Sequence, residues 1–350
     1  MKHKIMVFMA TIMAMTTSCG RQKYENMDVD AFAEMIKERE VQLLDVRTEA
    51  EYAKGHIDGA ALADVKRDDF VEAAKTMISK SQPVAVYCRS GKRSALAADL
   101  LAAEGYSVTN LKGGIMAWTA KGMPISQIET DAFVTPSGKN VRFYALLHSS
   151  IRIVFDGKEI HIDPVRQLGS RATDYGAMPK ADYILVTHEH HDHLDREAIS
   201  QLSGDGTLLI ANARCCELVG YGRAMANGEK IDLADGINLE AVPAYNTTDD
   251  RTQFHPKGRD NGYVLTIDGL RVYIAGDTED IAEMSQLGNI DIAFLPCNQP
   301  YTMTVEQLLK AARTVKPRVL FPYHLGQTDV SKIAADLTCD GIETRLRHYE

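Results

Sequence analysis

The stretch "THEHHDHLD", which begins at Thr187, holds four histidines and one aspartate within six positions. It follows an apolar run, "ADYILV", that is typical of a buried strand. Histidines two residues apart in an extended segment face the same way, so His188 and His190 are predicted to bind one metal ion. Asp192 and His193 come at the turn that follows and are predicted to bind a second ion. Imidazoles and a carboxylate suit zinc, with iron or manganese as alternatives.

Neither metal site is complete within this stretch. Asp277 follows the strand-like run "RVYIAG", and His324 follows "RVLFPY", so both are predicted at strand ends that can hold a ligand. A carboxylate at Asp277 can bridge two metal ions. The other histidines beyond the motif are His255, in a polar loop, and His348, near the end of the chain where segments often fray. A bound metal makes hydroxide available near neutral pH, and Asp192 is predicted to orient that water and accept its proton.

A second reactive group is Cys88, in "YCRSGKRSA", where a strand meets the start of a helix. Backbone N–H groups of the loop and the helix N-terminus lower a thiol pKa, and nearby cations add to the effect. We therefore predict a nucleophilic Cys88 with Arg89 and Arg93 as catalytic partners. The same loop is predicted to cradle an anion or a persulfide sulfur through Ser90, Gly91, Lys92 and Ser94.

The elements around these two sites differ in kind. Strands and helices alternate between about residues 28 and 125, which predicts a small α/β domain with a parallel sheet. From Phe133 onward, period-two strands and Asp-Gly turns predict sheets packed on each other with helices outside. The formal net charge of −9 argues against a nucleic-acid partner. No apolar run approaches the roughly 20 residues of a membrane span.

The first domain, predicted over residues 24–128, resembles a rhodanese. The resemblance rests on "LLDVRTEAEYAKGHIDGA", "VAVYCRSGKRSALAADLLAAEGY" and "LKGGIMAW". It implies helices on both faces of the sheet, and a Cys88 persulfide loaded from a sulfane-sulfur donor. In related phosphatases five residues separate the cysteine from an arginine, which places that arginine at the position of Ser94. Here only four residues separate Cys88 from Arg93, and this shorter loop favours sulfur over phosphate. Asp45, Arg47 and His56 match family positions that we interpret as structural.

The second domain, predicted over residues 135–350, resembles the metallo-β-lactamase fold, an αββα sandwich. The motif H-x-H-x-D-H, "AGDT" and "FPYHLG" carry the resemblance. It implies a hydrolase with two zinc ions. The opening "LLHSSIRIVFDGKEIHIDP" is similar to the ascorbate-phosphate lactonase branch, in which a histidine equivalent to His148 lies near the site. Asp163 is expected to contact the metal ligands and hold them in place without binding the metal itself.

One family ligand is missing from its usual place. The third histidine of the first metal should follow the strand "LEAVPAY", but that position is Asn246. Either His255 folds back to supply the ligand, or the site is one ligand short; we expect His255. Asn246 then lies beside the site. Lys257 and Arg259 are candidates to receive an anionic substrate.

The N-terminus has the layout of a secretory signal. "MKHKIMVFMATIMAMTTSCG" has a basic start, an apolar stretch and small residues before Cys19. It resembles a bacterial lipoprotein signal over residues 1–19, with Cys19 lipidated and the protein anchored to a membrane facing the periplasm. A plain signal peptide is the alternative. The oligomeric state is left open.

Three functions remain open from the sequence. The first is a metal-dependent hydrolase of an anionic small molecule, with a sulfurtransferase module ahead of it. The second is a sulfur-oxidising enzyme similar to persulfide dioxygenases, which use one iron and usually carry the metal domain first. The third is a non-catalytic protein that senses or binds sulfur or metal.

Overall fold

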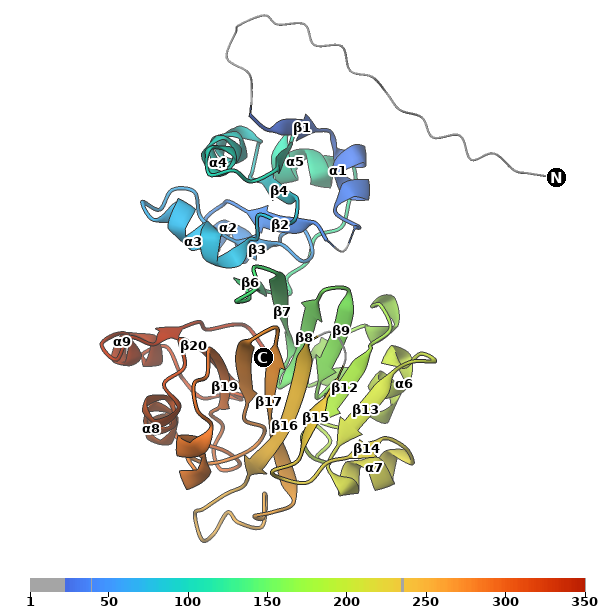
Figure 1. Cartoon of the computed structure of the whole chain (residues 1–350), viewed down its shortest axis with the longest axis vertical. Helices are drawn as coiled ribbons and strands as arrows, with labels where there is room; N and C mark the ends of the chain where they lie inside the picture. Colours follow the sequence, from blue (N-terminus) through green and yellow to red (C-terminus); the bar gives the residue numbers. More distant parts are fainter. Residues whose placement is uncertain (1–22, 39, 234–235, 350) are drawn as a thin grey trace, which may run out of the picture.

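The computed structural model describes residues 23–38, 40–233 and 236–349 of the 350-residue chain. It has two domains, the first in blue and teal and the second in green to red (Figure 1). The predicted signal segment and Cys19 lie outside the described residues. Among the helices that are described, none has the length and apolar character needed to cross a membrane.

The first domain is built on a parallel sheet with strand order β1-β5-β4-β2-β3. The strands and helices alternate along the chain, as the sequence predicts. They are β1 (Glu25–Met27), α1 (Val29–Met35), β2 (Gln42–Asp45), α2 (Glu49–Tyr52), β3 (Ala61–Leu62), α3 (Phe70–Met77), β4 (Val84–Tyr87), α4 (Lys92–Ala103), β5 (Val108–Leu111) and α5 (Gly114–Ala120).

Two apolar clusters cover the two faces of this sheet. Side chains of α3 and α4, such as Phe70 and Leu101, pack on one face. Side chains of α1 and α5, such as Phe32 and Trp118, pack on the other. Strands buried on both faces are expected to be apolar throughout, and β4 is fully buried along "VAVY". The predicted arrangement of helices on both faces is confirmed.

The second domain contains two facing sheets. The first consists of β6 (Thr130–Val134), β7 (Asn140–Leu147), β8 (Ser150–Phe155), β9 (Lys158–Ile162), β12 (Tyr183–Val186), β13 (Leu208–Ala211) and β14 (Arg223–Ala224), in that order. The second, also in chain order, consists of β15 (Lys230–Asp232), β16 (Ile237–Ala244), β17 (Asp260–Ile267), β18 (Leu270–Ile274), β19 (Ile292–Pro296), β20 (Val319–Tyr323) and β21 (Glu343–Thr344). A short hairpin joins β10 (Gln167–Leu168) to β11 (Arg171–Ala172).

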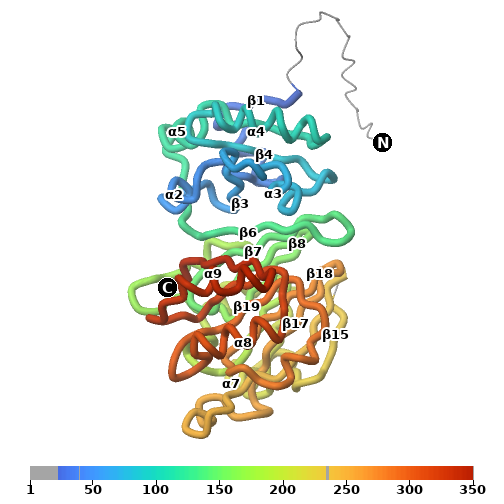
Figure 2. Tube along the Cα trace, turned by 90° about the vertical axis from the view of Figure 1, so that its left-hand side faces the viewer, coloured from blue at the N-terminus to red at the C-terminus, as the bar shows by residue number. Residues whose placement is uncertain are grey.

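The main core lies between the two sheets. Phe143 of the first sheet packs on Phe294 of the second, with ring centroids 6.0 Å apart. Outside the first sheet lie α6 (Arg196–Leu202), α7 (Ala213–Val219) and the 3-10 turn η1 (Tyr175–Ala177). Outside the second lie α8 (Val305–Val315), α9 (Ile333–Thr338) and η2 (Ala282–Gln286). The predicted αββα sandwich is confirmed (Figures 1 and 2).

The two domains share one sheet, which the sequence did not lead us to expect. Strand β3 of the first domain pairs with β6 of the second at Ala61 and Thr130, so twelve strands run on without a break. The hydroxyl of Tyr52 accepts the backbone N–H of Thr130 at 3.1 Å. Nε2 of His56 lies 2.8 Å from the carbonyl oxygen of Ile128. The junction is therefore a continuation of backbone pairing, and Figure 2 shows β6 between the two domains.

Candidate functional site

The candidate metal ligands come from the ends of strands in both sheets of the sandwich. His188 and His190 follow β12, Asp277 follows β18 and His324 follows β20. Each of these three strands is buried and parallel to a neighbour, and the carboxyl ends of parallel strands are where such folds place ligands. His148 reaches the same end of the sandwich from the tight turn between β7 and β8.

These side chains form two clusters, and in each cluster the possible ligand atoms lie within 4.8 Å of one another. The clusters are described here as the first and the second. The first consists of His188, His190, His255 and Asp277; the second consists of His148, Asp192, His193 and His324. All seven predicted metal ligands are thus brought together.

Asp277 lies between the two clusters. Its Oδ2 is 3.4 Å from Nε2 of His255 in the first cluster and 3.2 Å from Nε2 of His324 in the second. Its Oδ1 is 3.3 Å from Nε2 of His193. One carboxylate therefore faces histidines of both clusters, which is the geometry needed for a bridging ligand.

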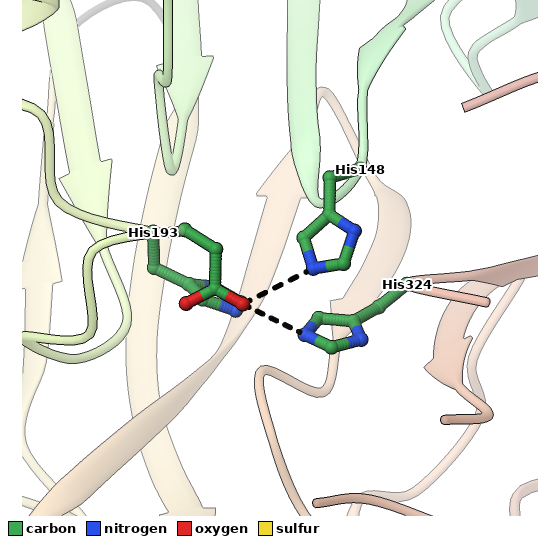
Figure 3. A group of neighbouring side chains, drawn as sticks. His148, His193 and His324 are labelled. Carbon is green, nitrogen blue, oxygen red and sulfur yellow. Dashed lines mark ion pairs between the residues drawn. The ribbon is translucent and has the colours of Figure 1, made fainter. Parts of the chain in front are cut away.

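The second cluster includes His148, which we expected only near the site. Its Nε2 lies 3.3 Å from Oδ2 of Asp192, and Nε2 of His324 lies 3.6 Å from the same oxygen. Figure 3 shows His148, His193 and His324 turned toward one another, with dashed lines marking these two ion pairs. The structure thus adds His148 to the possible ligand set.

The missing third histidine is explained by a loop. His255 is fully buried, and its ring centroid lies 4.8 Å from those of both His188 and His190. Asn246 is not in either cluster; its side-chain amide donates to the carbonyl oxygen of Tyr301 at 2.8 Å. The chain thus places a histidine nine residues later where the family strand end has one.

The clusters fit a divalent metal. Nε2 of His255 and Nε2 of His324 are buried and make no hydrogen bond within the described part of the chain. Buried polar atoms in native structures almost always have a partner, and an ion is a common one where none is visible. Histidine nitrogens around carboxylate oxygens are a donor set that suits zinc, iron or manganese.

Polar groups behind the ligands hold them in place. Oδ2 of Asp163 lies 2.8 Å from Nδ1 of His193, and the same carboxylate accepts the Thr187 N–H and hydroxyl, each at 2.7 Å. Asp260 Oδ2 lies 3.0 Å from Nδ1 of His255 and is itself paired with Arg259. Such outer partners fix ring orientation and raise ligand basicity.

The electrostatics of the clusters favour ionised carboxylates. Burial raises the pKa of Asp277, but His324 and His193 lower it further, so it lies well below its usual range. Burial lowers the pKa of His193, yet Asp277 and Asp163 raise it well above its ordinary value. Burial and His193 hold the pKa of His188 well below normal, so this ring is neutral and able to donate a lone pair.

Several predicted neighbours lie elsewhere. Lys257, a candidate for receiving substrate, is exposed and pairs with Glu283 at 2.8 Å and with the Tyr245 hydroxyl at 3.0 Å. The guanidinium of Arg259 forms an ion pair with the carboxylate of the next residue, Asp260, at 2.7 Å at the start of β17. The side chain of His191 is 91% exposed, which leaves it outside the clusters.

Two features at the metal clusters have no simple sequence signal. His148, Asp163 and His324 all have positive φ angles of 43–54°, a region that side chains other than glycine rarely adopt. Glu279 is fully buried two residues after Asp277 and binds the loop that carries His255. A buried glutamate at that position is visible only once its partners, about thirty residues earlier, are known.

The Cys88 loop closes around the sulfur. The Gly91 N–H donates to Sγ at 3.2 Å and the Ser94 hydroxyl donates to it at 3.3 Å. Burial raises the pKa of Cys88, but hydrogen bonds from Ser94, Ser90 and Gly91 lower it by more, so the net pKa is below normal. A Cβ at Gly114 would come within 2.3 Å of the Cys88 carbonyl oxygen, so only glycine fits beneath the loop.

The positively charged side chains of this loop lie in two different environments. Arg89 and Lys92 are exposed at the mouth, as is Ser90. Arg93 forms a two-pronged ion pair with Glu51 of α2, at 2.6 and 2.7 Å. The hydrogen bond from Arg93 is the main cause of a Glu51 pKa lowered to about 2. Hydrogen bonds from the loop, rather than a free Arg93 charge, therefore stabilise the thiolate most directly.

Three further residues of this domain have structural roles. Arg47 and Asp45 are buried and joined at 2.8 and 2.9 Å, and Arg47 also donates to the Gly55 carbonyl. His56 stacks on Tyr52 with ring centroids 3.7 Å apart. These contacts hold the turn that leads into the interdomain junction.

Comparison with known proteins agrees with this two-domain fold. A beta-lactamase superfamily domain matches residues 142–324, and a rhodanese-like domain matches residues 28–121. A UPF0173 metal-dependent hydrolase of Thermococcus onnurineus is 33% identical over 192 residues, which cover 53% of this chain and 83% of the relative. The crystal structure of a putative metal-dependent hydrolase from Parabacteroides distasonis is 48% identical, covers 64% of this chain and all of its own, and superposes with a TM-score of 0.61.

A metallo hydrolase from Ignicoccus hospitalis is also similar, with 28% identity, a TM-score of 0.51 and coverage of 59% of this chain and 94% of its own. The chain therefore belongs to the beta-lactamase superfamily. More narrowly, it is a metal-dependent hydrolase of that superfamily with a rhodanese-like domain ahead of the sandwich. The resemblance to ascorbate-phosphate lactonases stays a prediction.

Proposed function

We propose that the sandwich domain hydrolyses a small anionic substrate at a two-metal centre, with zinc as the metal. The observation that carries this proposal is Asp277, which faces His255 of the first cluster and His324 of the second within 3.4 Å. Two separate four-residue clusters, with Asp277 of the first facing histidines of the second, favour two ions over the single iron of a persulfide dioxygenase.

The two clusters would hold the zinc ions, and the chemistry that zinc would supply there is activation of water near neutral pH and polarisation of the substrate. Asp192 is one-fifth exposed, so its carboxylate is accessible from the solvent side of the second cluster. Burial raises its pKa, but the neighbouring imidazoles of His148 and His324 lower it well below normal. It is therefore ionised at neutral pH, the form a metal-binding carboxylate needs, and we propose from its position beside the second cluster that it orients the attacking water.

The anionic character of the substrate is inferred from the charge of the metals and not from Lys257, whose ammonium is paired with Glu283. We propose a carboxylic ester or lactone as the scissile group, in line with the predicted lactonase branch. Hydrolysis of a panel of lactones, esters, amides and phosphodiesters by the full chain tests this. Turnover of phosphodiesters alone would contradict it.

We propose that the rhodanese-like domain carries sulfane sulfur on Cys88. The thiolate attacks the outer sulfur of a donor such as thiosulfate, a new S–S bond forms, and sulfite leaves with the electron pair of the broken bond. The hydrogen bonds to Sγ from Gly91 and Ser94 support the negative charge before and after transfer. Mass spectrometry should find one added sulfur atom on wild-type protein and none on Cys88→Ser.

Metal analysis is the decisive experiment for the hydrolase. Full-length protein should hold about two zinc ions per chain, and chelation should abolish hydrolysis that zinc restores. One iron per chain, with oxygen uptake on glutathione persulfide, would instead establish the dioxygenase. Metal bound without turnover of either substrate class would favour a sensing role.

We also propose that the protein is exported and anchored through a lipidated Cys19. The proposal rests on the basic and apolar pattern of residues 1–19. Metabolic labelling with a radioactive fatty acid should mark the wild type and leave Cys19→Ser unlabelled. Label on both proteins, or on neither, contradicts a lipid anchor at this residue.

A further inference from the structure

The loop that carries His255 leaves the second sheet and returns to its starting point. Ala244 at the end of β16 pairs with Asp260 at the start of β17, so the strands stop in register and the residues between them form a closed excursion. The Asn246 N–H donates to the His255 carbonyl oxygen at 2.9 Å. His255 thus reaches the first cluster from a loop whose two ends are held together by backbone pairing.

A single buried carboxylate holds the first part of the excursion. Oε2 of Glu279 accepts the backbone N–H of Thr247 at 2.7 Å and that of Thr248 at 2.8 Å. Both threonine hydroxyls donate to the same carboxylate at 2.8 Å, and Nη1 of Arg251 lies 3.4 Å away. Glu279 has no exposed surface, so its charge is compensated almost wholly by this one segment of loop.

The backbone around Glu279 is bonded to the same loop. The Glu279 N–H donates to the Tyr245 carbonyl oxygen at 3.0 Å. The Thr278 hydroxyl accepts the Tyr245 N–H at 3.1 Å and lies 3.0 Å from the Tyr245 carbonyl oxygen. Thr278 and Glu279, which follow Asp277, are thus hydrogen-bonded to the start of the loop that leads to His255. Two ligands of the first cluster are positioned by one set of hydrogen bonds.

We propose that Glu279 is a positioning residue that holds this excursion closed and so allows His255 to complete the first metal cluster. This inference rests on the proposed two-metal centre. Glu279 acts through the loop, because its carboxylate accepts hydrogen bonds from Thr247 and Thr248 and forms an ion pair with Arg251. Its removal affects the first cluster, whereas the second cluster draws no ligand from the loop.

Glu279→Gln in the full chain tests the proposal. Glutamine keeps the volume but turns an amide group toward backbone N–H donors, so the excursion is expected to open. Zinc titration should show at least tenfold weaker binding of one of the two zinc ions, with the other unchanged. Limited trypsin digestion should cut after Arg251 about tenfold faster than in the wild type.

Glu283→Gln is the matched control. Glu283 also touches this loop, but through the exposed Lys257 ion pair, and such pairs contribute little. It should bind both zinc ions and resist trypsin as the wild type does. Thr248→Val removes one hydroxyl donor and should show a smaller effect in the same direction. Thr248→Val replaces Glu279→Gln as the test if Glu279→Gln fails to fold, which far-UV circular dichroism will show.

The outcomes separate this inference from the proposed function. Wild-type zinc affinities and trypsin rates in both Glu279→Gln and Thr248→Val overturn the positioning role. A wild-type chain that binds only one zinc ion overturns the two-metal function. In that case His255→Ala still decides the inference: unchanged zinc binding by that variant shows that the excursion supplies no ligand.

Discussion

At the scale of single residues, reactivity depends on what surrounds an atom more than on its type. Cys88 shares its type with Cys215, whose thiol pKa is raised by burial to a value above the normal range. The Cys88 pKa is lowered because the Ser94 hydroxyl and loop N–H groups reach Sγ. The sequence led us to expect loop N–H donors and Arg93 beside Cys88. In the structure Arg93 is paired with Glu51, a partner that nothing local in the sequence indicates.

Ser94→Ala should raise the pKa of Cys88. The variant loses a hydrogen bond to a charged acceptor, worth roughly 1.5 kcal/mol, so alkylation by iodoacetamide below the thiol pKa should slow about tenfold. The rate is measured against pH, with Cys88→Ser used to subtract the other cysteines. An unchanged pH midpoint would show that backbone donors alone stabilise the thiolate.

His161 should make the fold less stable in acid. It is fully buried, neither ring nitrogen makes a hydrogen bond in the described residues, and burial with nearby Arg152 lowers its pKa to about 3. Because the unfolded ring has a pKa near 6.5, the unfolded chain binds the extra proton between pH 6.5 and 3. Stability attributable to this residue is therefore full above pH 6.5 and falls as the pH drops through that window.

The matching experiment compares wild type with His161→Leu by urea unfolding at pH 8 and pH 5. Between pH 8 and pH 5 the free energy of unfolding should fall by about 2 kcal/mol more in the wild type than in the variant. Equal losses in the two proteins would falsify a neutral, buried His161.

At the scale of elements, strand ends were predictable and long-range supports were not. The runs before His188, Asp277 and His324 are apolar and end in a polar ligand, so their roles as strand ends follow from local pattern. His255 lies in a polar loop with no such pattern. Its placement depends on Glu279, and a contact between distant segments leaves no periodicity in the sequence.

The C-terminal segment is held by one buried carboxylate. Asp131 of β6 binds both Arg345 and Arg347 at 2.7 Å, and the Tyr349 carbonyl oxygen accepts the His148 N–H at 2.8 Å. This segment therefore links the strand at the domain junction to the turn that carries His148.

Arg347→Met should destabilise the protein by about 3 kcal/mol, because it leaves Asp131 buried with one of its two cationic partners. The measurement is the free energy of unfolding in urea. Arg313→Met is the control, since its ion pair with Asp340 is exposed and should contribute below about 1 kcal/mol. Similar losses in the two variants would contradict a structural role for the buried network.

At the scale of the whole molecule, one continuous sheet runs through both domains. The order of the domains and the α/β and packed-sheet character of each were predictable from periodicity, and their particular folds from the resemblance to known families, but their joining was not. It depends on a parallel bridge between Ala61 and Thr130 and on the Tyr52 hydroxyl, which only the assembled fold brings together.

The two domains should therefore unfold together. Trp118, the only tryptophan, reports on the first domain through its fluorescence, while zinc release reports on the second. In wild type the two urea midpoints should coincide. Tyr52→Phe leaves the Thr130 N–H without its acceptor, which costs about 1–3 kcal/mol, and should separate them. Separate midpoints in the wild type would show that the sheet does not couple the domains.

The left-handed backbone at His148, Asp163 and His324 sets a conflict between stability and chemistry. A side chain in this region costs of order 1 kcal/mol that glycine does not, and at these three positions the strained residue is also a buried group of the metal centre or of its hydrogen-bonded support. Glycine, which relieves this strain at an ordinary turn, is therefore not a stabilising choice at these three positions.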